Sequence, residues 1–96
     1  GRFAATARYL EGMVRLEQHR AADAERLFTR AARLRNDYLA PRERLVELYV
    51  AQVRPADIRS QLTEIETIRP LTLDELVLEI VADDPILPAE DGIATM

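Results

Sequence analysis

The most reactive pairing in this sequence is formed by two glutamates, Glu43 and Glu47, which stand four residues apart. On a helix that spacing places both carboxylates on one face, where they could hold a cation or act as an acid–base pair. Arg42 and Arg44 flank them, so a solvated and charged helix face explains the same pattern. We favour the solvated face, and we rank recognition of a partner above catalysis as its function.

Other residue types that carry chemistry are scarce, with one histidine, one serine and no cysteine. His19 has no second ligand or nucleophile to complete a site, and we assign it to a turn because histidine tolerates a positive φ. Ser60 is predicted to face solvent. The acids of residues 83–91 lack the alternating ligands of a calcium loop. We therefore predict no enzyme activity, no catalytic residue, no metal site and no cofactor.

Charge is distributed unevenly along the chain. All 13 basic residues are arginine, against 17 acids, which gives a net charge of −4. Residues 1–48 hold ten arginines and seven acids, a balance of +3, whereas residues 49–96 hold three arginines and ten acids, a balance of −7. This asymmetry predicts electrostatic pairing between the two halves or between copies of the chain.

Three arginines, Arg26, Arg30 and Arg33, have the spacing of a stripe on one helix face. Such a stripe could contact the phosphates of a nucleic acid. The absence of lysine, the acidic net charge and the lack of interleaved aromatic residues weaken that interpretation. A solvated face, paired locally with Asp23 and Glu25, is the preferred alternative.

Apolar residues recur at spacings of three and four along most of the chain, which predicts an all-α fold. Pro55 opens one helix, Pro70 ends it, and Thr72-Leu-Asp-Glu75 has the pattern of a capping box. No apolar run reaches the roughly 18 residues that a membrane span needs. Five helices are predicted, at about 3–18, about 21–35, from a first turn at Pro41 through Val53, from Pro55 to Pro70, and at about 72–82. Residues 83–96 are predicted to be an acidic, proline-containing tail or linker.

A shift of 34 residues superposes the helix boundaries and places Phe28 on Leu62 and Ala31 on Ile65. A helix–turn–helix unit of this length is typical of tetratricopeptide repeats. The chain resembles that family, and its matching positions are Gly12, Ala24, Phe28 and Ala31 in one repeat and Leu45, Tyr49 and Pro70 in the next.

The resemblance implies antiparallel helical hairpins stacked as a short solenoid within residues 1–82. Its two repeats would cover about 5–38 and 39–72, and the helix at about 72–82 would cap them. The resemblance also implies that the chain is a piece of a larger bacterial protein of this family.

For function, the resemblance implies a non-enzymatic scaffold for protein–protein interaction. The first helix of each repeat would line a concave face that binds a peptide or a partner's helix. The predicted lining residues are Tyr9, Met13, Leu16, Glu43, Glu47 and Val50. An alternative stays open for the first helix, in which Tyr9 and Met13 pack against a preceding repeat or the N-terminal residues.

Two further functions follow in rank. The last helix has a wide apolar arc, so the chain could be a structural or oligomerisation segment of a longer solenoid. The residues expected to mediate this self-association are Leu73, Leu76, Leu78 and Val81. Weak nucleic-acid binding by the arginine-rich second helix ranks last.

Overall fold

The computed structural model describes residues 2–83, and within them the chain is entirely helical apart from its turns. This confirms the all-α class and the five predicted helices. Asp83 ends the last helix, and the rest of the predicted tail lies outside the described residues. Within residues 2–83, none of the helices combines the length and the hydrophobicity that a membrane span requires. The helices are α1 (Ala4–Glu17), α2 (Ala21–Leu34), α3 (Leu39–Ala51), α4 (Pro55–Glu66) and α5 (Leu73–Asp83).

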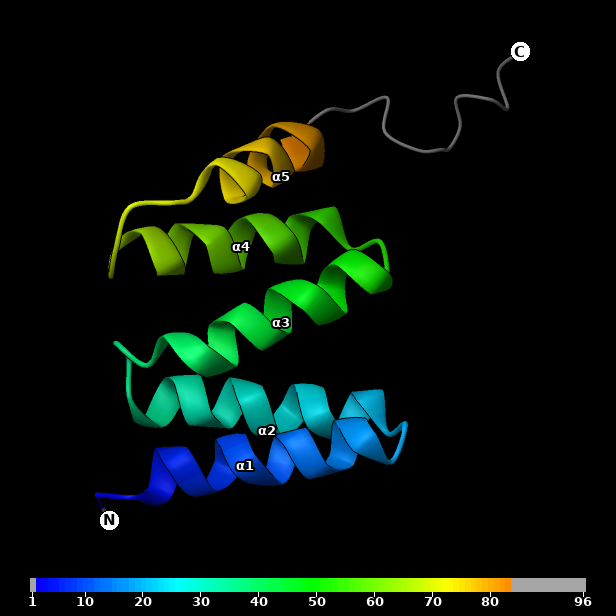
Figure 1. Ribbon diagram of the computed structural model, residues 1–96, viewed down its shortest axis with the longest axis vertical. Coiled ribbons are helices and arrows are strands. Elements are labelled where there is room, and N and C mark those ends of the chain that lie inside the picture. Colours follow the sequence, from blue (N-terminus) through cyan, green and yellow to red (C-terminus); the bar gives the residue numbers. More distant parts are fainter. Residues whose placement is uncertain (1, 84–96) are drawn as a thin grey trace.

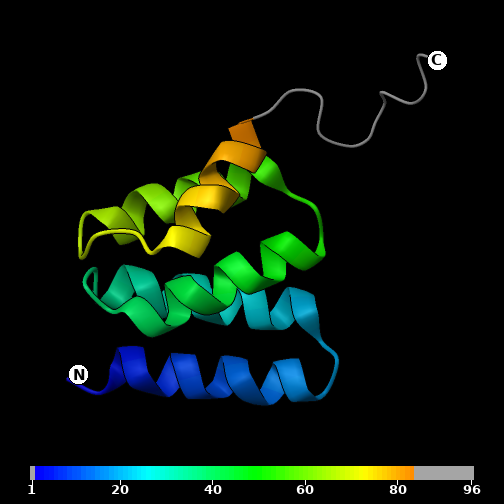
Figure 2. The same ribbon diagram turned by 45° about the horizontal axis from the view of Figure 1, so that its top comes forward.

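Consecutive helices run in opposite directions and lie against one another in chain order (Figure 1). The main contacts join α1 to α2, α2 to α3, α3 to α4, and α4 to α5. The turned view separates the layers, with α1 at one end and α5 lying against α4 at the other (Figure 2). Because the connections between the helices are short, each helix packs antiparallel against its neighbour in the chain.

The core lies between these layers, and its largest member is Phe28 of α2, which is fully buried. Gly12 of α1 is also buried, and its Cα faces the Phe28 ring. A glycine at this point lets the two helices approach closely. The other buried residues of the main cluster are Ala24, Leu45, Val46, Leu48, Tyr49, Ile58, Leu62 and Ile65.

The turn from α1 to α2 is closed by His19, whose φ is 61°. The His19 amide donates to the Leu16 carbonyl, and the Arg20 amide donates to the Arg15 carbonyl, both at 2.9 Å. This pair of bonds is a Schellman motif, which satisfies carbonyls that the helix end leaves free. The predicted turn role of His19 is therefore confirmed.

The turn from α3 to α4 has the same conformation 34 residues later. Val53 has a φ of 52°, its amide donates to the Val50 carbonyl at 3.1 Å, and the Arg54 amide donates to the Tyr49 carbonyl at 2.9 Å. The prediction that the third helix extends through Val53 is wrong, because α3 ends at Ala51. Val53 follows the helix and is 66% exposed, because the left-handed turn directs it away from the core.

Several apolar residues that recur at spacings of three and four in the first predicted helix, about 3–18, are not the buried ones. Phe3, Leu10 and Val14 are exposed, whereas Ala5 and Gly12 are buried. The face of α1 that carries small residues packs on α2 because small residues permit the closest approach. Leu10 and Val14 are left exposed on α1, and Phe3 is left exposed just before it.

Candidate protein-binding site

The three predicted lining residues on α1 are half-buried and pack against the core. They are Tyr9, Met13 and Leu16. The Tyr9 ring lies 5.8 Å from the Phe28 ring and meets the Tyr38 ring edge-on at 5.7 Å. Aromatic pairs at such distances stabilise packing beyond their buried area. Tyr9 therefore holds the first hairpin together while keeping part of its surface open.

The three predicted residues on α3, in contrast, are exposed. Glu43 pairs with Arg69 at 3.1 Å, and Glu47 pairs with Arg44 at 3.0 Å. Each carboxylate thus has its own guanidinium, which fits the solvated face favoured from the sequence. Within residues 2–83 no group of three or more His, Cys, Asp or Glu side chains could hold a metal ion.

Arg44 lies near residues of both the α1 and the α3 sets. The nearby Tyr9 hydroxyl, followed by Glu47, raises the pKa of the Arg44 guanidinium. Arg44 Nη1 donates to Glu47 Oε1 at 3.0 Å. The sequence had suggested Arg44 only as a flanking charge.

Arg42, the other arginine expected on the solvated face, is instead buried at 8% exposure. Its Nη1 donates to Gln61 Oε1 of α4 at 3.3 Å, and within the described residues its Nε has no hydrogen-bond partner. Arg42 points toward α4 because α3 is covered on two sides, by α2 and by α4. Its role is in packing α3 against α4, and the sequence pattern held no sign of this.

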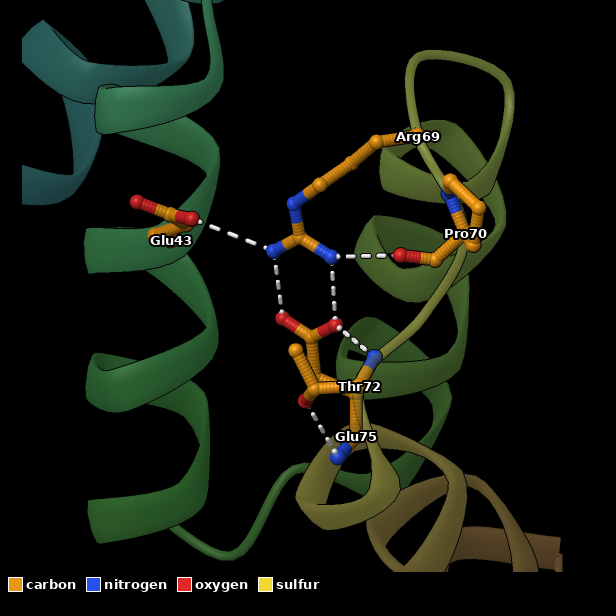
Figure 3. A network of polar contacts seen from close by, with 5 residues as sticks. All are labelled: Glu43, Arg69, Pro70, Thr72 and Glu75. Atoms are coloured by element: carbon orange, nitrogen blue, oxygen red, sulfur yellow. Dashed lines mark hydrogen bonds and ion pairs between the residues drawn. The ribbon is translucent and has the colours of Figure 1, made fainter.

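A polar network ties the start of α5 to α3 (Figure 3). Arg69 donates through both Nη atoms to Glu75 at 2.8 Å, to the Pro70 carbonyl at 2.8 Å, and to Glu43 of α3. The Thr72 amide donates to Glu75 at 2.9 Å, and the Glu75 amide donates to Thr72 Oγ1 at 3.2 Å. The predicted capping box is confirmed. Its carboxylate also anchors Arg69, and this bonding lowers the pKa of Glu75 to about 2.

An apolar hollow of about 170 Å³ lies where the end of α3 and the start of α4 meet α5. Val50 is the one predicted site residue that lines it. Sequence reasoning missed the hollow because it placed Val53 inside the third helix and not in a turn. The lining residues are Val50, Val53, Pro55, Ile58, Leu78, Val81 and Ala82.

Helix α5 contains no buried residue and leaves a broad apolar face open. Leu73 is 76% and Ile80 70% exposed, and Leu76, Val77 and Val81 are also exposed. Among the residues predicted to mediate self-association, Leu78 differs because it is half-buried against the core. The open face of α5 therefore excludes Leu78 and includes Val77 and Ile80.

The arginine stripe of α2 is only partly neutralised by the acids expected to do so. Asp23 pairs with Arg26 and with Arg20, as the sequence had indicated for Arg26. Glu25 pairs instead with Arg54, which directly precedes α4, at 2.8 Å and accepts a hydrogen bond from the Tyr49 hydroxyl at 3.2 Å. Burial and the neighbouring Glu25 raise the pKa of Tyr49 to about 12.

Comparisons of the chain with models of protein families, with curated proteins and with solved structures find no match. The described residues define an all-α chain of five consecutively packed helices. Its most distinctive surfaces are an apolar hollow beside α5, the open face of α5, and an arginine-lined face on α2.

Proposed function

We propose that the chain is a non-enzymatic protein-binding module of the tetratricopeptide-repeat type, which holds a peptide or a partner's helix on the side formed by α1, α3 and α5. The observation that carries this proposal is the apolar hollow of about 170 Å³ at the junction of α3, α4 and α5. An apolar cavity of about 150 Å³ accommodates a benzene ring. The hollow therefore has the size to receive one large apolar side chain of a partner as an anchor.

The repeated turn geometry supports the assignment to a repeat architecture. The left-handed residues His19 and Val53 are 34 residues apart, and both close a Schellman motif between paired helices. In that register α1 and α3 are equivalent first helices, and Leu16 and Val50 occupy the same place in each. First helices that present equivalent positions in succession can form a continuous binding side.

The polar surroundings of the hollow indicate the chemistry of the ligand. Glu47 is exposed one turn before Val50 on α3 and pairs with Arg44 at 3.0 Å. A basic group of a ligand would find the Glu47 carboxylate accessible, while its apolar neighbour enters the hollow. The proposed ligand is therefore an apolar peptide segment that carries a positive charge.

A titration of the intact chain with peptides of this type, followed by NMR, tests the proposal. Resonances of Val50 and Val81 should shift together, and Val50→Asp should weaken binding by roughly tenfold or more, as expected for a contact that anchors an interface. Val14→Asp is the matched control, because Val14 is an exposed valine on α1 away from the hollow. Equal weakening by both variants, or no shift at Val50 with any peptide of the class, would reject the proposal.

Self-association is the second candidate function, and the exposure of Leu73 and Ile80 on α5 favours it. Burial of such an apolar face against another chain is favourable by about 25 cal/mol per Å². Sedimentation velocity should then show a concentration-dependent dimer that Ile80→Glu abolishes. A monomer at every concentration would exclude this candidate and leave the peptide-binding proposal untouched.

A further inference from the structure

The two ends of the helix stack each have one helix that is covered on a single side. In the middle of the stack, α3 contacts both α2 and α4 and buries six residues. At the ends, α1 contacts chiefly α2 and buries two residues, and α5 contacts chiefly α4 and buries none (Figure 2). The outer faces of α1 and α5 are therefore the surfaces that a further helix could cover.

The outer face of α1 carries an apolar stripe formed by Phe3, Leu10 and Val14. Gly12 faces Phe28 of α2, and Leu10 and Val14 each stand two residues from Gly12, about 200° around the helix. Both are more than half exposed. Phe3, seven residues before Leu10, is also strongly exposed and extends the same stripe. We call these three residues the α1 stripe.

The outer face of α5 carries a matching stripe formed by Leu73, Val77 and Ile80. Leu78 and Ala82 pack against the core, and Ile80 stands two residues from each of them, again about 200° around the helix. Leu73 and Val77 precede Ile80 by seven and three residues, so the three exposed side chains share one face. We call them the α5 stripe.

Charges of opposite sign accompany the two stripes. The Arg2 guanidinium lies over the Phe3 ring, 5.4 Å from its centroid, and Arg15 directly follows Val14. In α5, Asp74 directly follows Leu73 and Glu79 directly precedes Ile80. None of these four charged residues makes an ion pair within residues 2–83. The α1 stripe therefore has a positive border and the α5 stripe a negative one.

The same separation of charge holds for the rest of the described chain. Apart from the buried Arg42, the arginines of residues 2–83 that make no ion pair lie on or beside the first two helices, namely Arg2, Arg15, Arg30 and Arg33. Of the five acids in that range without an ion pair, Glu17 ends α1. The other four lie on the last two helices and are Glu64, Glu66, Asp74 and Glu79.

Ion pairs between the two halves of the sequence do not remove this separation. The described pairs that join residues 1–48 to residues 49–83 are Glu25 with Arg54 and Glu43 with Arg69. In both, the first half supplies the acid and the second half the arginine, which is opposite to the direction that the net charges suggest. Arginines of the first half and acids of the second half are thus left for contacts outside the molecule.

We infer that copies of this chain associate head to tail, with the α5 stripe of one copy packed against the α1 stripe of the next. The inference rests on the self-association given above as the second candidate function, and it names the surface that the open face of α5 meets. One such contact covers an apolar face at each end of the stack. It also brings the acids beside the α5 stripe to the arginines beside the α1 stripe, as charges that flank a helix seam do in a coiled coil.

A symmetric contact fits less well. Two α5 stripes packed together would place Asp74 and Glu79 of one copy near the same acids of the other, and two α1 stripes would oppose arginine with arginine. Each symmetric contact would also leave the other stripe uncovered. A head-to-tail contact leaves one free stripe of each kind, so a dimer is its first product and longer assemblies follow.

The dimensions of the stripes agree with this contact. At 1.5 Å per residue, Leu73 to Ile80 rises about 10 Å and Phe3 to Val14 about 16 Å, so the α1 stripe can cover the whole α5 stripe. A single helix pair buries less than the roughly 800 Å² per partner of a standard interface, so association should become visible at concentrations on the order of 100 μM.

A complementation experiment by sedimentation velocity tests the direction of the contact. Leu10→Glu blocks the α1 stripe and leaves the α5 stripe intact, whereas Ile80→Glu does the reverse. Each variant alone should associate at least about tenfold more weakly than the parent protein. An equimolar mixture of the two should recover a one-to-one dimer and nothing larger, because only one unblocked stripe of each kind is available. Both positions are exposed, and far-UV circular dichroism checks that helix content is unchanged.

Matched variants separate the stripes from general charge effects. Ala51→Glu adds the same charge at the exposed end of α3, in the middle of the stack, and should associate like the parent protein. Asp74→Asn with Glu79→Gln should weaken association roughly three- to tenfold, since two exposed ion pairs contribute modestly. Glu64→Gln with Glu66→Gln removes two acids from α4 and should have a smaller effect.

The outcomes distinguish this inference from the functions proposed above. Recovery of a dimer only in the mixture upholds head-to-tail association. A Leu10→Glu protein that still dimerises, or a mixture that stays monomeric while the parent protein associates, would overturn the inference and leave self-association standing. A parent protein that is monomeric up to about 1 mM would overturn both and leave the peptide-binding proposal untouched.

Discussion

The ring of Phe28 lies so close to Gly12 that a Cβ atom at position 12 would stand 2.7 Å from Cε1 and 2.8 Å from Cδ1 of that ring. Phe28 is fully buried, so any shift of its ring would displace neighbouring core residues. The two residues therefore set the separation of α1 and α2.

Gly12→Ala should lower the free energy of unfolding by about 1 kcal/mol. Overpacking a buried site costs about 1–3 kcal/mol, and replacing a helical glycine by alanine returns about 1 kcal/mol. Urea unfolding measures the difference. Ala7→Gly, at an exposed position of the same helix, gives the propensity contribution alone, and Phe28→Leu should make the Gly12→Ala substitution tolerable by removing the ring. A Gly12→Ala variant as stable as the parent protein in both backgrounds would contradict the contact.

Val53→Gly should raise the free energy of unfolding by about 0.5–1 kcal/mol. A left-handed conformation costs a residue with a Cβ about 1–2 kcal/mol, and the extra freedom of glycine in the unfolded chain offsets part of that gain. Thermal unfolding would show a higher midpoint. Val50→Gly, inside α3, should have the opposite sign, and His19→Gly a smaller gain than Val53→Gly because histidine tolerates this conformation better. A destabilised Val53→Gly protein would show that its side chain contributes more than its backbone costs.

The sequence was sufficient to predict where the helices lie. It was not sufficient to predict which face of each helix is buried. Helical periodicity and the prolines placed the five helices to within a few residues, and the capping-box pattern at Thr72 located the start of α5. Periodicity alone could not tell which side of α1 packs inward, because Gly12 and Ala5 contribute little to an apolar pattern and yet allow the closest contact. The left-handed conformation of Val53 was equally hidden, since valine is the residue type least expected there.

The hydrogen-bonded carboxylate of Glu75 should make the free energy of unfolding depend on pH. Its pKa is lowered from 4.5 to about 2, chiefly by hydrogen bonding to Arg69. A carboxyl group whose pKa is lower in the folded state stabilises that state above the unfolded pKa, and the contribution is lost as the pH falls from about 4.5 towards 2. With the partial exposure of Arg69 taken into account, the contribution is about 1–2 kcal/mol.

Urea unfolding at pH 7 and at pH 2.5 tests this expectation. Glu75→Gln should be less stable than the parent protein at pH 7 and should differ little from it at pH 2.5. Glu66→Gln serves as the control, because Glu66 is exposed at the end of α4. The same pH dependence in the parent and Glu75→Gln proteins would show that the network with Arg69 does not stabilise the fold.

The hydroxyl of Tyr49 should lose its proton at a higher pH than an ordinary tyrosine does. Burial, followed by the nearby Glu25, raises its pKa from 10.0 to about 12. A tyrosine with a raised pKa stabilises the folded state fully below pH 10, and this stabilisation is lost as the pH rises through about 12. Absorbance of tyrosinate should show a step near pH 12 that is missing from Tyr49→Phe. In Glu25→Gln the step should move to lower pH without reaching 10, because burial remains; an unchanged step would remove Glu25 as a cause.

The candidate binding surfaces could be predicted only in part. The shared face of Glu43 and Glu47 followed from their spacing, but the pairing of Glu43 with Arg69 depends on how α3 meets the segment between α4 and α5. Glu25 illustrates the limit most clearly. Its nearest arginines in sequence lie on α2, yet its partner is Arg54 at the start of α4, because packing brings that residue within 2.8 Å.

The layered order of the helices has a consequence for how the chain folds. Each helix contacts chiefly its neighbours in sequence, so few contacts require distant segments to meet before others form. Such a low contact order favours fast folding that can begin in either hairpin. It also lets α5, which touches mainly α4 and has no buried residue, detach without disturbing α1 and α2. Hydrogen exchange should therefore decrease from α5 toward the interior of the stack, and the end of the chain that offers the widest apolar face is also the end that opens most readily.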